Sequence, residues 1–312
     1  AAFGTVAGKK GDITVEITTY RSESYELDSR KPNVEFGKTI EADLSRRDFT
    51  INAMALELTT DEPTFIDLFN GVLDLQKKII KTPSKAEDSF SDDPLRMMRA
   101  ARFMSQLNFE VDESVLVAIK NMAARLEIIS AERIRDEFIK IMMSSSPRLG
   151  ITLLVETGLS DYFLPEVPKL KLEIDEHHHH KDVYEHSLTV LEQAIASEAR
   201  IGGANLTLRL TALLHDIGKP KTRALLPDGG VSFHHHEVVG ARMCKERMKK
   251  LRFDNHIIND VSKLISLHLR FHGYGNGEWT DSAVRRYVRD EKELLIHLHL
   301  LTRADCTTRN QK

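Results

Sequence analysis

The segment DDPLRMMRAARFMSQL (Asp92–Leu107) decides most of what can be predicted about the first half of this chain. It predicts a helix, because Asp93 is in position to cap the first turn and Pro94 is favoured at the first helical position. Its apolar residues recur with the helical period and predict a core-facing stripe. Asp92 or Ser91 can supply the cap if Asp93 has another role.

One flank of the predicted helix carries charge. Asp93, Arg96, Arg99 and Arg102 recur at every third residue, so a carboxylate is followed by three guanidinium groups. A carboxylate only accepts hydrogen bonds and a guanidinium only donates them. Asp93 and Arg96 together therefore match the amine and ring nitrogen of cytosine or adenine, whereas uracil and guanine present a carbonyl where the amine would be. Arg99 and Arg102 remain for phosphates. A helix cap with surface ion pairs is the alternative interpretation.

The composition excludes several classes of protein. The chain is 41% hydrophobic and 29% charged, and it has no apolar run near the roughly 20 residues that a membrane span needs. The first residues lack the pattern of a signal peptide. Cys244 and Cys306 are far apart and predict reduced thiols in a cytoplasmic protein without membrane contact. A net charge of −3 does not by itself indicate a nucleic-acid binder, although Arg46 and Arg47 are locally basic.

The periodicity changes along the chain and predicts an α+β protein. Alternation of Ile13, Val15 and Ile17 with polar residues predicts a half-buried strand. DEPTFIDLFNG is predicted to be a turn and linker. Helical patterns follow from about residue 74, and the second half is predicted to be helical apart from one hairpin signal, LLPDGGVSF. The expected domains are residues 1–62, 63–170 and 171–312.

The second half concentrates residue types that bind metals. Most of the 14 histidines of the chain lie there. The candidate ligands are His186, His215, Asp216, His236, His268 and Asp305. On converging helices they would supply nitrogen and oxygen ligands for a divalent ion, with enough donors for a second one. Such a site activates water against a phosphate ester, and Lys219 is near enough in sequence to stabilise the phosphate charge. Imidazole ligands favour nickel, cobalt or manganese over magnesium. Buried structural histidines are the alternative, and the run at 177–180 is expected to be a loop near the metal cleft.

Two segments of the first half resemble motifs of a known family. RRDFTINAMA (Arg46–Ala55) and DDPLRMMRAARF (Asp92–Phe103) are similar to conserved motifs of the bacterial CCA tRNA nucleotidyltransferase and poly(A) polymerase family of class II, most like its actinobacterial members. The resemblance implies that Asp93 and Arg96 are a protein template for the incoming base. Asp92 departs slightly from the family, which more often has Glu.

The resemblance also implies roles for other residues. The further nucleotide-binding residues would be Arg47, Asn52, Arg99 and Arg102. Asp48 becomes a candidate catalytic acid. Glu16 could be the third carboxylate of a polymerase-type metal site, although a polar residue on the solvent face of a strand is an equal alternative.

The second half resembles another superfamily. The order H…HD…H…H…D, with the pair in LLHDIGKP, is similar to HD phosphohydrolases of the HDIG type. In related nucleotidyltransferases this domain has phosphatase and cyclic phosphodiesterase activity, which is what the resemblance implies. The expected fold is therefore the remnant of a polymerase-beta-like nucleotidyltransferase sheet, a mostly helical neck that binds RNA and selects the base, and an all-helical HD domain.

These resemblances predict template-independent addition of CMP and AMP to tRNA 3′ ends from CTP and ATP, with an accessory phosphohydrolase. The family's aspartate pair and its Gly-Gly-x-Val-Arg-Asp loop precede a strand like FGTV, and neither occurs in these residues. We therefore expect most ligands of the catalytic Mg²⁺ to lie upstream, and no nucleotide transfer by these 312 residues alone. A stand-alone HD phosphohydrolase with a vestigial RNA-binding front half is one alternative. A poly(A) polymerase is another, disfavoured by the HD domain.

Overall fold

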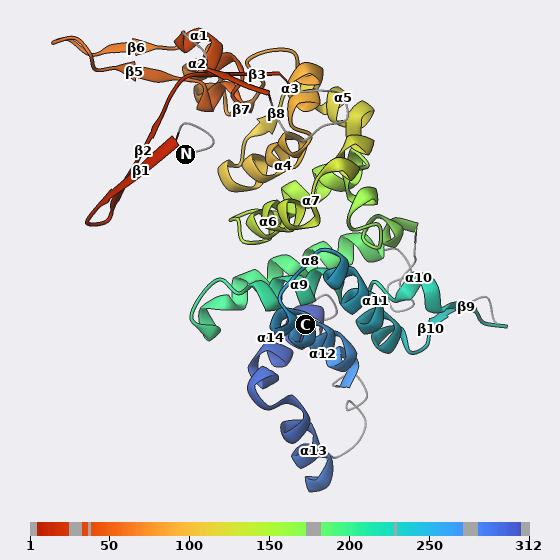
Figure 1. Cartoon of the computed structure of the whole chain (residues 1–312). Coiled ribbons are helices and arrows are strands. Elements are labelled where there is room, and N and C mark those ends of the chain that lie inside the picture. Colours follow the sequence, from red (N-terminus) through yellow and green to blue (C-terminus); the bar gives the residue numbers. More distant parts are fainter. Residues whose placement is uncertain are drawn as a thin grey trace. The chain divides into compact units, whose positions relative to one another are not determined.

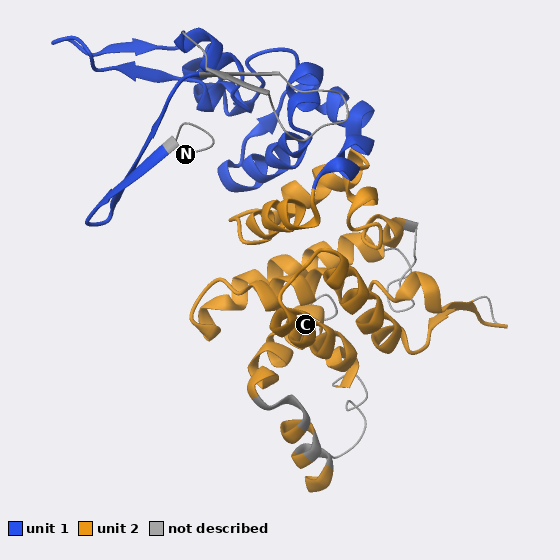
Figure 2. Cartoon of the chain, in the orientation of Figure 1, with its two compact units in different colours: residues 1–129 blue, residues 130–312 orange. Residues whose placement is uncertain are grey.

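The computed structural model describes residues 5–24, 33–36, 39–172, 182–227, 230–270 and 280–306. The chain forms two compact units, residues 1–129 and residues 130–312 (Figure 2). Unit 1 combines helices with two-stranded sheets, and the described part of unit 2 is helical apart from one hairpin. The fold is α+β, as predicted. In the described residues, no helix has both the length and the apolar character of a membrane span.

The strands of unit 1 form separate antiparallel pairs (Figure 1). They are β1 (Thr5–Lys10) with β2 (Ile13–Thr18), β3 (Arg21–Ser24) with β4 (Asn33–Phe36), and β5 (Ala55–Glu57) with β6 (Thr64–Ile66). The prediction of a half-buried strand was wrong for β2, since Ile13, Val15 and Ile17 are 69%, 55% and 69% exposed. Period-2 alternation determines which side chains share a face but not whether anything covers that face.

The predicted linker DEPTFIDLFNG also needs correction, because it contains β6. Leu56 of β5 stands opposite Phe65 of β6. Such cross-strand apolar pairs stabilise a hairpin that a count of turn residues does not detect.

Unit 1 contains the charged helix and several shorter helices, of which α3 (Ala86–Asp92) contacts it. These helices are α1 (Ile40–Ser45), α2 (Gly71–Lys77), α3, α4 (Leu95–Leu107) and α5 (Glu113–Met122), with 3-10 turns at Thr50–Asn52 and Ala123–Ile128. Beneath α4, β7 (Ile79–Ile80) pairs in parallel with β8 (Glu110–Val111). The predicted helix is confirmed: Met98 and Ala101 are completely buried, and Leu95 N donates to Asp93 Oδ1 at 3.1 Å.

Unit 2 is a helical bundle. Its helices are α6 (Ala131–Met142), α7 (Pro147–Glu156), α8 (Val183–Ser197), α9 (Leu206–Leu214), α10 (Lys219–Thr222), α11 (His236–Lys250), α12 (Asn255–Leu267), α13 (Asp281–Glu291) and α14 (Leu295–Cys306). The hairpin β9 (Arg223–Leu225) and β10 (Val231–Phe233) follows α10, where the turn signal predicts it. Apart from this hairpin, the described part of residues 183–306 is helical, as expected. The packed apolar sides of α8, α9, α12 and α14 form a core that holds one polar cluster, described below.

One buried arginine joins the first helices of unit 2 to the bundle. Arg209 of α9 is 4% exposed and makes a bidentate ion pair with Glu198 at 2.7 Å. Its Nη1 also donates to the carbonyls of Met142 and Ser144 at the end of α6. A guanidinium can satisfy both kinds of acceptor at once because its donors form a fixed fork.

Candidate functional sites

The guanidinium of Arg96 is held in one orientation by atoms of unit 1. Its Nη1 donates to Ser89 Oγ at 2.8 Å, and its Nη2 donates to the carbonyl of Arg46 at 2.7 Å. Ser89 itself is 2% exposed, on the side of α3 that faces α4. Arg96 is therefore oriented by α3 and by the start of the segment Arg46–Ala55.

A second arginine ties the same two segments together. Arg99 donates from Nε to Asp48 Oδ2 at 2.8 Å, and its Nη2 also contacts this oxygen. The other carboxylate oxygen of Asp48 accepts from Phe49 N at 2.9 Å and Asn52 Nδ2 at 3.1 Å. Asp48 is buried, so these bonds compensate for its lost hydration. We predicted from the sequence that Arg99 is available to bind phosphate, whereas in the structure its guanidinium is paired with Asp48. Its predicted contact with nucleotide and the catalytic role of Asp48 stay predictions.

The remaining candidates of unit 1 lie in different settings. Arg102 lies over the ring of Phe103, with the guanidinium carbon 4.3 Å from the ring centroid. Arg47 donates to Asp43 Oδ2 at 2.8 Å. Glu16 lies on exposed β2 opposite Ala7, and the described residues show no hydrogen bond to its carboxylate.

Asp43 is a residue that sequence reasoning missed. It accepts from both Arg46 and Arg47, at 2.6 Å and 2.8 Å, and is 5% exposed. Burial raises its pKa, but the two arginines outweigh burial, so the pKa lies below the ordinary value. The spacing of three and four residues along α1 was the available signal.

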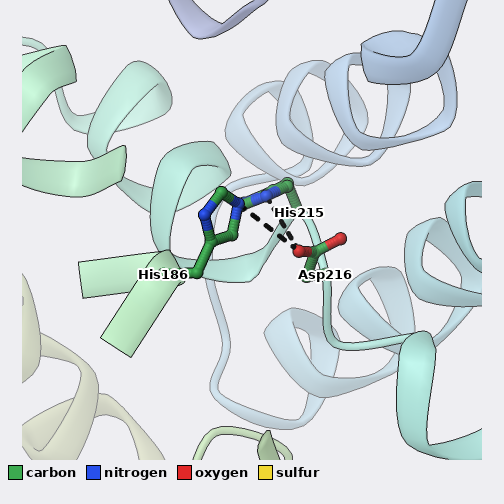
Figure 3. Close-up of side chains that lie close together, drawn as sticks. All are labelled: His186, His215 and Asp216. Carbon is green, nitrogen blue, oxygen red and sulfur yellow. Dashed lines mark ion pairs between the residues drawn. The ribbon is translucent and has the colours of Figure 1, made fainter. Parts of the chain in front are cut away.

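Every predicted metal ligand of unit 2 reaches one buried cluster. Two groups of three residues bring ligand atoms within 4.8 Å of one another: His186, His215 and Asp216, and Asp216, His236 and His268. Figure 3 shows the first group, in which the two imidazoles face the Asp216 carboxylate. The ligands come from α8, α11 and the ends of α9 and α12, and Asp305 joins them from α14.

The histidine rings are held so that Nε2 faces the cluster. The Nδ1 atoms of His215, His236 and His268 lie 2.9, 2.8 and 2.7 Å from the carbonyls of residues 212, 233 and 265. A carbonyl only accepts, so each Nδ1 carries the proton and the Nε2 of a neutral ring presents a lone pair. None of the three Nε2 atoms has a partner in acceptable hydrogen-bond geometry among the described residues. Buried Nε2 atoms that face the same cluster fit a divalent cation once each ring is neutral.

Asp216 lies between the two groups. Its Oδ2 is 3.1 Å from His215 Nε2 and 3.8 Å from His186 Nε2, while its Oδ1 is 3.3 Å from His236 and 3.9 Å from His268. Each carboxylate oxygen thus faces one pair of imidazoles. Asp216 belongs to both groups, and the donor set contains enough ligands to hold two ions.

Charges within the cluster change its acid–base behaviour. Burial would lower the pKa of His215, but the Asp216 carboxylate outweighs burial and raises it to about 9. Burial, with the charge of His215 nearby, lowers the pKa of His268 to about 3. Burial disfavours ionisation of Asp216, yet His215 and Lys219 hold its pKa well below the usual range. Burial also disfavours ionisation of Asp305, but the hydrogen bond from His186 at 3.0 Å outweighs burial and lowers the pKa of Asp305.

Lys219 and Gly218 complete this site. Lys219 is 6% exposed, and its Nζ lies 3.0 Å from Asp216 Oδ2. A Cβ on Gly218 would lie 2.1 Å from the carbonyl oxygen of His236, so only glycine allows α10 to approach α11 this closely. The histidine run at 177–180, expected near this cleft, lies outside the described residues.

Sequence models of three known families match consecutive parts of the chain. Residues 1–81 match the poly(A) polymerase head domain, and residues 108–170 match the probable RNA- and SrmB-binding site of polymerase A. Residues 183–310 match the HD domain. The first two matches lie on either side of α4, and the third contains all six clustered histidine and aspartate residues.

Individual relatives agree with these matches. The chain is 35% identical over 272 residues to the A-adding tRNA nucleotidyltransferase of Deinococcus radiodurans, covering 85% of this chain and 60% of the relative. It is 46% identical over 159 residues to a CCA-adding enzyme of Lactobacillus delbrueckii, covering 51% of this chain and 39% of the relative. The chain therefore spans about 40% to 60% of the length of these relatives.

The fold matches solved structures over nearly the whole chain. The Bacillus stearothermophilus CCA-adding enzyme in complex with CTP superposes with a TM-score of 0.66, at 24% identity, over 98% of this chain and 63% of that one. The Thermotoga maritima CCA-adding enzyme complexed with tRNA gives a TM-score of 0.65 at 21% identity, over 97% of this chain and 62% of that one. At these identities the likeness concerns the fold.

Proposed function

This chain belongs to the bacterial tRNA nucleotidyltransferase and poly(A) polymerase family with an HD domain, and from this premise we propose that the protein adds cytidine and adenosine nucleotides to tRNA 3′ ends. Its substrates would be CTP, ATP and tRNA, with Mg²⁺ for the transfer, and its place of action the cytoplasm. The observation that carries the proposal is the start of α4, where Arg96 is held in one orientation one helical turn after Asp93. A carboxylate and a fixed guanidinium one turn apart would select bases that have an amine next to a ring acceptor.

The test is base selectivity, measured with the protein expressed from its whole gene. Wild type should incorporate CMP and AMP and reject UTP and GTP. Asp93→Ala should reduce this discrimination by about tenfold to a hundredfold, since one base-pairing contact contributes about 1–3 kcal/mol. The affinity for triphosphate should change less, because the phosphates are bound elsewhere. Selectivity that is unchanged in Asp93→Ala would exclude the template role.

The Deinococcus relative favours a narrower version of this function. That protein is named as A-adding, so addition of the terminal AMP alone is the second candidate. Two primers distinguish them: a tRNA that ends at the discriminator base and a tRNA that ends in CC. Incorporation of CMP on the first indicates CCA addition, and activity restricted to AMP on the second indicates A addition.

For unit 2 we propose metal-dependent hydrolysis of phosphate esters. His186, His215 and Asp216 would hold one ion, and Asp216, His236 and His268 a second, with Asp305 completing the first. When bound, such ions supply an activated water and neutralise phosphate charge. Lys219 lies close enough to Asp216 to add a positive charge at the same place. Nickel, cobalt and manganese match the imidazole-rich donor set better than magnesium does.

Metal content and hydrolysis of a 2′,3′-cyclic phosphate test this second activity. The purified protein should bind a transition metal and hydrolyse the cyclic ester. Asp216→Ala should abolish turnover and lower metal content, while selectivity at the Asp93–Arg96 pair stays unchanged. A protein with neither metal nor hydrolysis in nickel, cobalt and manganese would instead have structural histidines.

A further inference from the structure

Unit 2 contains a cavity next to the turn that follows His215 and Asp216. Its volume is about 430 Å³. It is lined by Pro165, Glu166, Lys169, Ile217, Pro220, Lys221, Met243, Glu246, Arg247 and Lys250. The lining comes from three places in the chain: the segment that leads into the 3-10 turn Pro168–Leu172, the turn with α10, and one face of α11. α10 and α11 lie side by side in Figure 1.

The charge of the lining favours an anion. Lys169, Lys221 and Lys250 are all exposed, and each comes from a different element. Arg247 is already engaged, because it makes a bidentate ion pair with Glu166 at 2.9–3.0 Å. That pair closes one wall and leaves three lysines against the single carboxylate of Glu246. Three ammonium groups around one hollow attract phosphate oxygens.

The chemistry of the lining indicates phosphate rather than a base. The apolar part consists of proline, isoleucine and methionine side chains, with no aromatic ring on which a base could stack. Nor does the lining include an asparagine or glutamine that could read a base edge. The base of a free nucleotide would therefore add little binding energy to that of its phosphates. A sugar–phosphate backbone, in contrast, needs only a positively charged surface of fitting shape in order to bind.

The surroundings point to a long polyanion. Residues 236–252 carry six lysines and arginines against two glutamates, although the whole chain has a net charge of −3. One wall of the cavity, Pro165–Lys169, lies at the end of the segment that matches an RNA-binding family model. The floor residue Ile217 directly follows the metal-cluster residue Asp216.

We propose that this cavity binds a phosphate of an RNA backbone and holds the RNA beside the metal cluster. The proposal rests on the proposed function only in that the protein acts on RNA. It assigns Lys169, Lys221 and Lys250 as phosphate contacts of unit 2.

The salt dependence of tRNA binding tests the assignment, with fluorescence anisotropy as the readout. Lys221→Gln and Lys250→Gln should each weaken binding and each reduce the slope of log K against log salt by about one, the value for one lost phosphate contact. Lys221→Arg keeps the charge and should keep the slope. Lys245→Gln is the matched control, since Lys245 is exposed on the same helix but does not line the cavity.

The outcomes separate the alternatives. Equal slopes of log K against log salt for Lys250→Gln and Lys245→Gln would mean that α11 attracts RNA diffusely. That result would overturn the proposal that the cavity binds a phosphate. Competition by CTP or inorganic phosphate at millimolar concentration, with no change in the RNA slope of the variants, would also overturn it. A wild-type protein that binds no tRNA contradicts the proposed function itself, which is a different result. Metal content and melting temperature, unchanged in every variant, show that the variants are folded.

Discussion

Orientation of a few side chains decides what each site can recognise. Arg96 is useful for base selection only if its remaining donors face the base, and Ser89 Oγ together with the Arg46 carbonyl prevents rotation of the guanidinium. In the metal cluster, carbonyl groups set the tautomer of three histidines in the same way. In both places a side chain with a proposed role is oriented by at least one atom that lies outside the motifs, namely Ser89 Oγ or a carbonyl of residue 212, 233 or 265.

Ser89→Ala should therefore relax base selectivity. Without the hydroxyl the guanidinium keeps fewer acceptors, and the loss of one hydrogen bond to a charged group is about 1.5–3 kcal/mol. We expect misincorporation of UMP to rise by roughly tenfold to a hundredfold for that free energy. Ser89→Thr, which keeps the hydroxyl, should restore selectivity. Steady-state kinetics with each triphosphate measure this, and a uniform fall in kcat without loss of selectivity would indicate only a packing role.

Metal binding should release a proton at pH 7.5. The pKa of His215 is raised to about 9, so this ring is protonated in the metal-free protein until the pH rises through that value. The metal needs the lone pair of Nε2 and must displace the proton, so affinity should increase about tenfold per pH unit below 9. His268, with its pKa lowered to about 3, is already neutral and releases none.

The same shift affects the metal-free fold. A pKa raised above the unfolded value stabilises the fold fully below about pH 6.5, and this stabilisation is lost as the pH rises through about 9.

The proton release on metal binding is measured by calorimetric titrations of the metal in two buffers that differ in ionisation enthalpy. A binding enthalpy that is independent of the buffer at pH 7.5 would show that His215 is neutral before the metal arrives.

At the scale of elements, close approach between helices brings the ligands together. His236 begins α11, and the chain around Gly218 packs directly against the start of that helix. A Cβ at Gly218 would also lie 2.7 Å from Gly240 N. Such contacts cannot be relieved by side-chain rotation because both atoms belong to the backbone.

Gly218→Ala should displace α11 and separate His236 from Asp216. The second group of ligands would be lost while His186 and His215 stay in place, so we expect the number of bound ions to fall from two to about one. Elemental analysis measures the ratio. Gly8→Ala is the control, because a Cβ at Gly8 has no neighbour within 4 Å. Two ions retained in Gly218→Ala would show that the helix pair tolerates the shift.

On the scale of the whole molecule, the two proposed activities fall in separate compact units. The residues proposed for base selection belong to residues 1–129, and the six candidate metal ligands belong to residues 130–312. Ligands that bind one unit stabilise that unit by mass action. Each unit therefore has its own core and its own dependence on ligands.

Heating should show this independence. With nickel or manganese at 100 times its dissociation constant, the unfolding free energy of unit 2 should rise by about 2.7 kcal/mol. Differential scanning calorimetry should give two transitions, of which the metal shifts only one. Asp216→Ala should remove the shift. One transition, or two that move together, would mean that the units unfold as a single cooperative body.

Motif residues and helices were predictable from the sequence because their signals are local. The start of α4 was predicted to within one residue from Asp93 and Pro94, and the six candidate metal ligands, chosen by their order along the chain, lie close together in the structure. Tertiary structure alone decided the rest. Exposure of β2 depends on what covers it, and the pairing of Arg99 with Asp48 joins residues that are 51 positions apart. Sequence periodicity states which side chains share a face, whereas partners distant in the chain are chosen by packing.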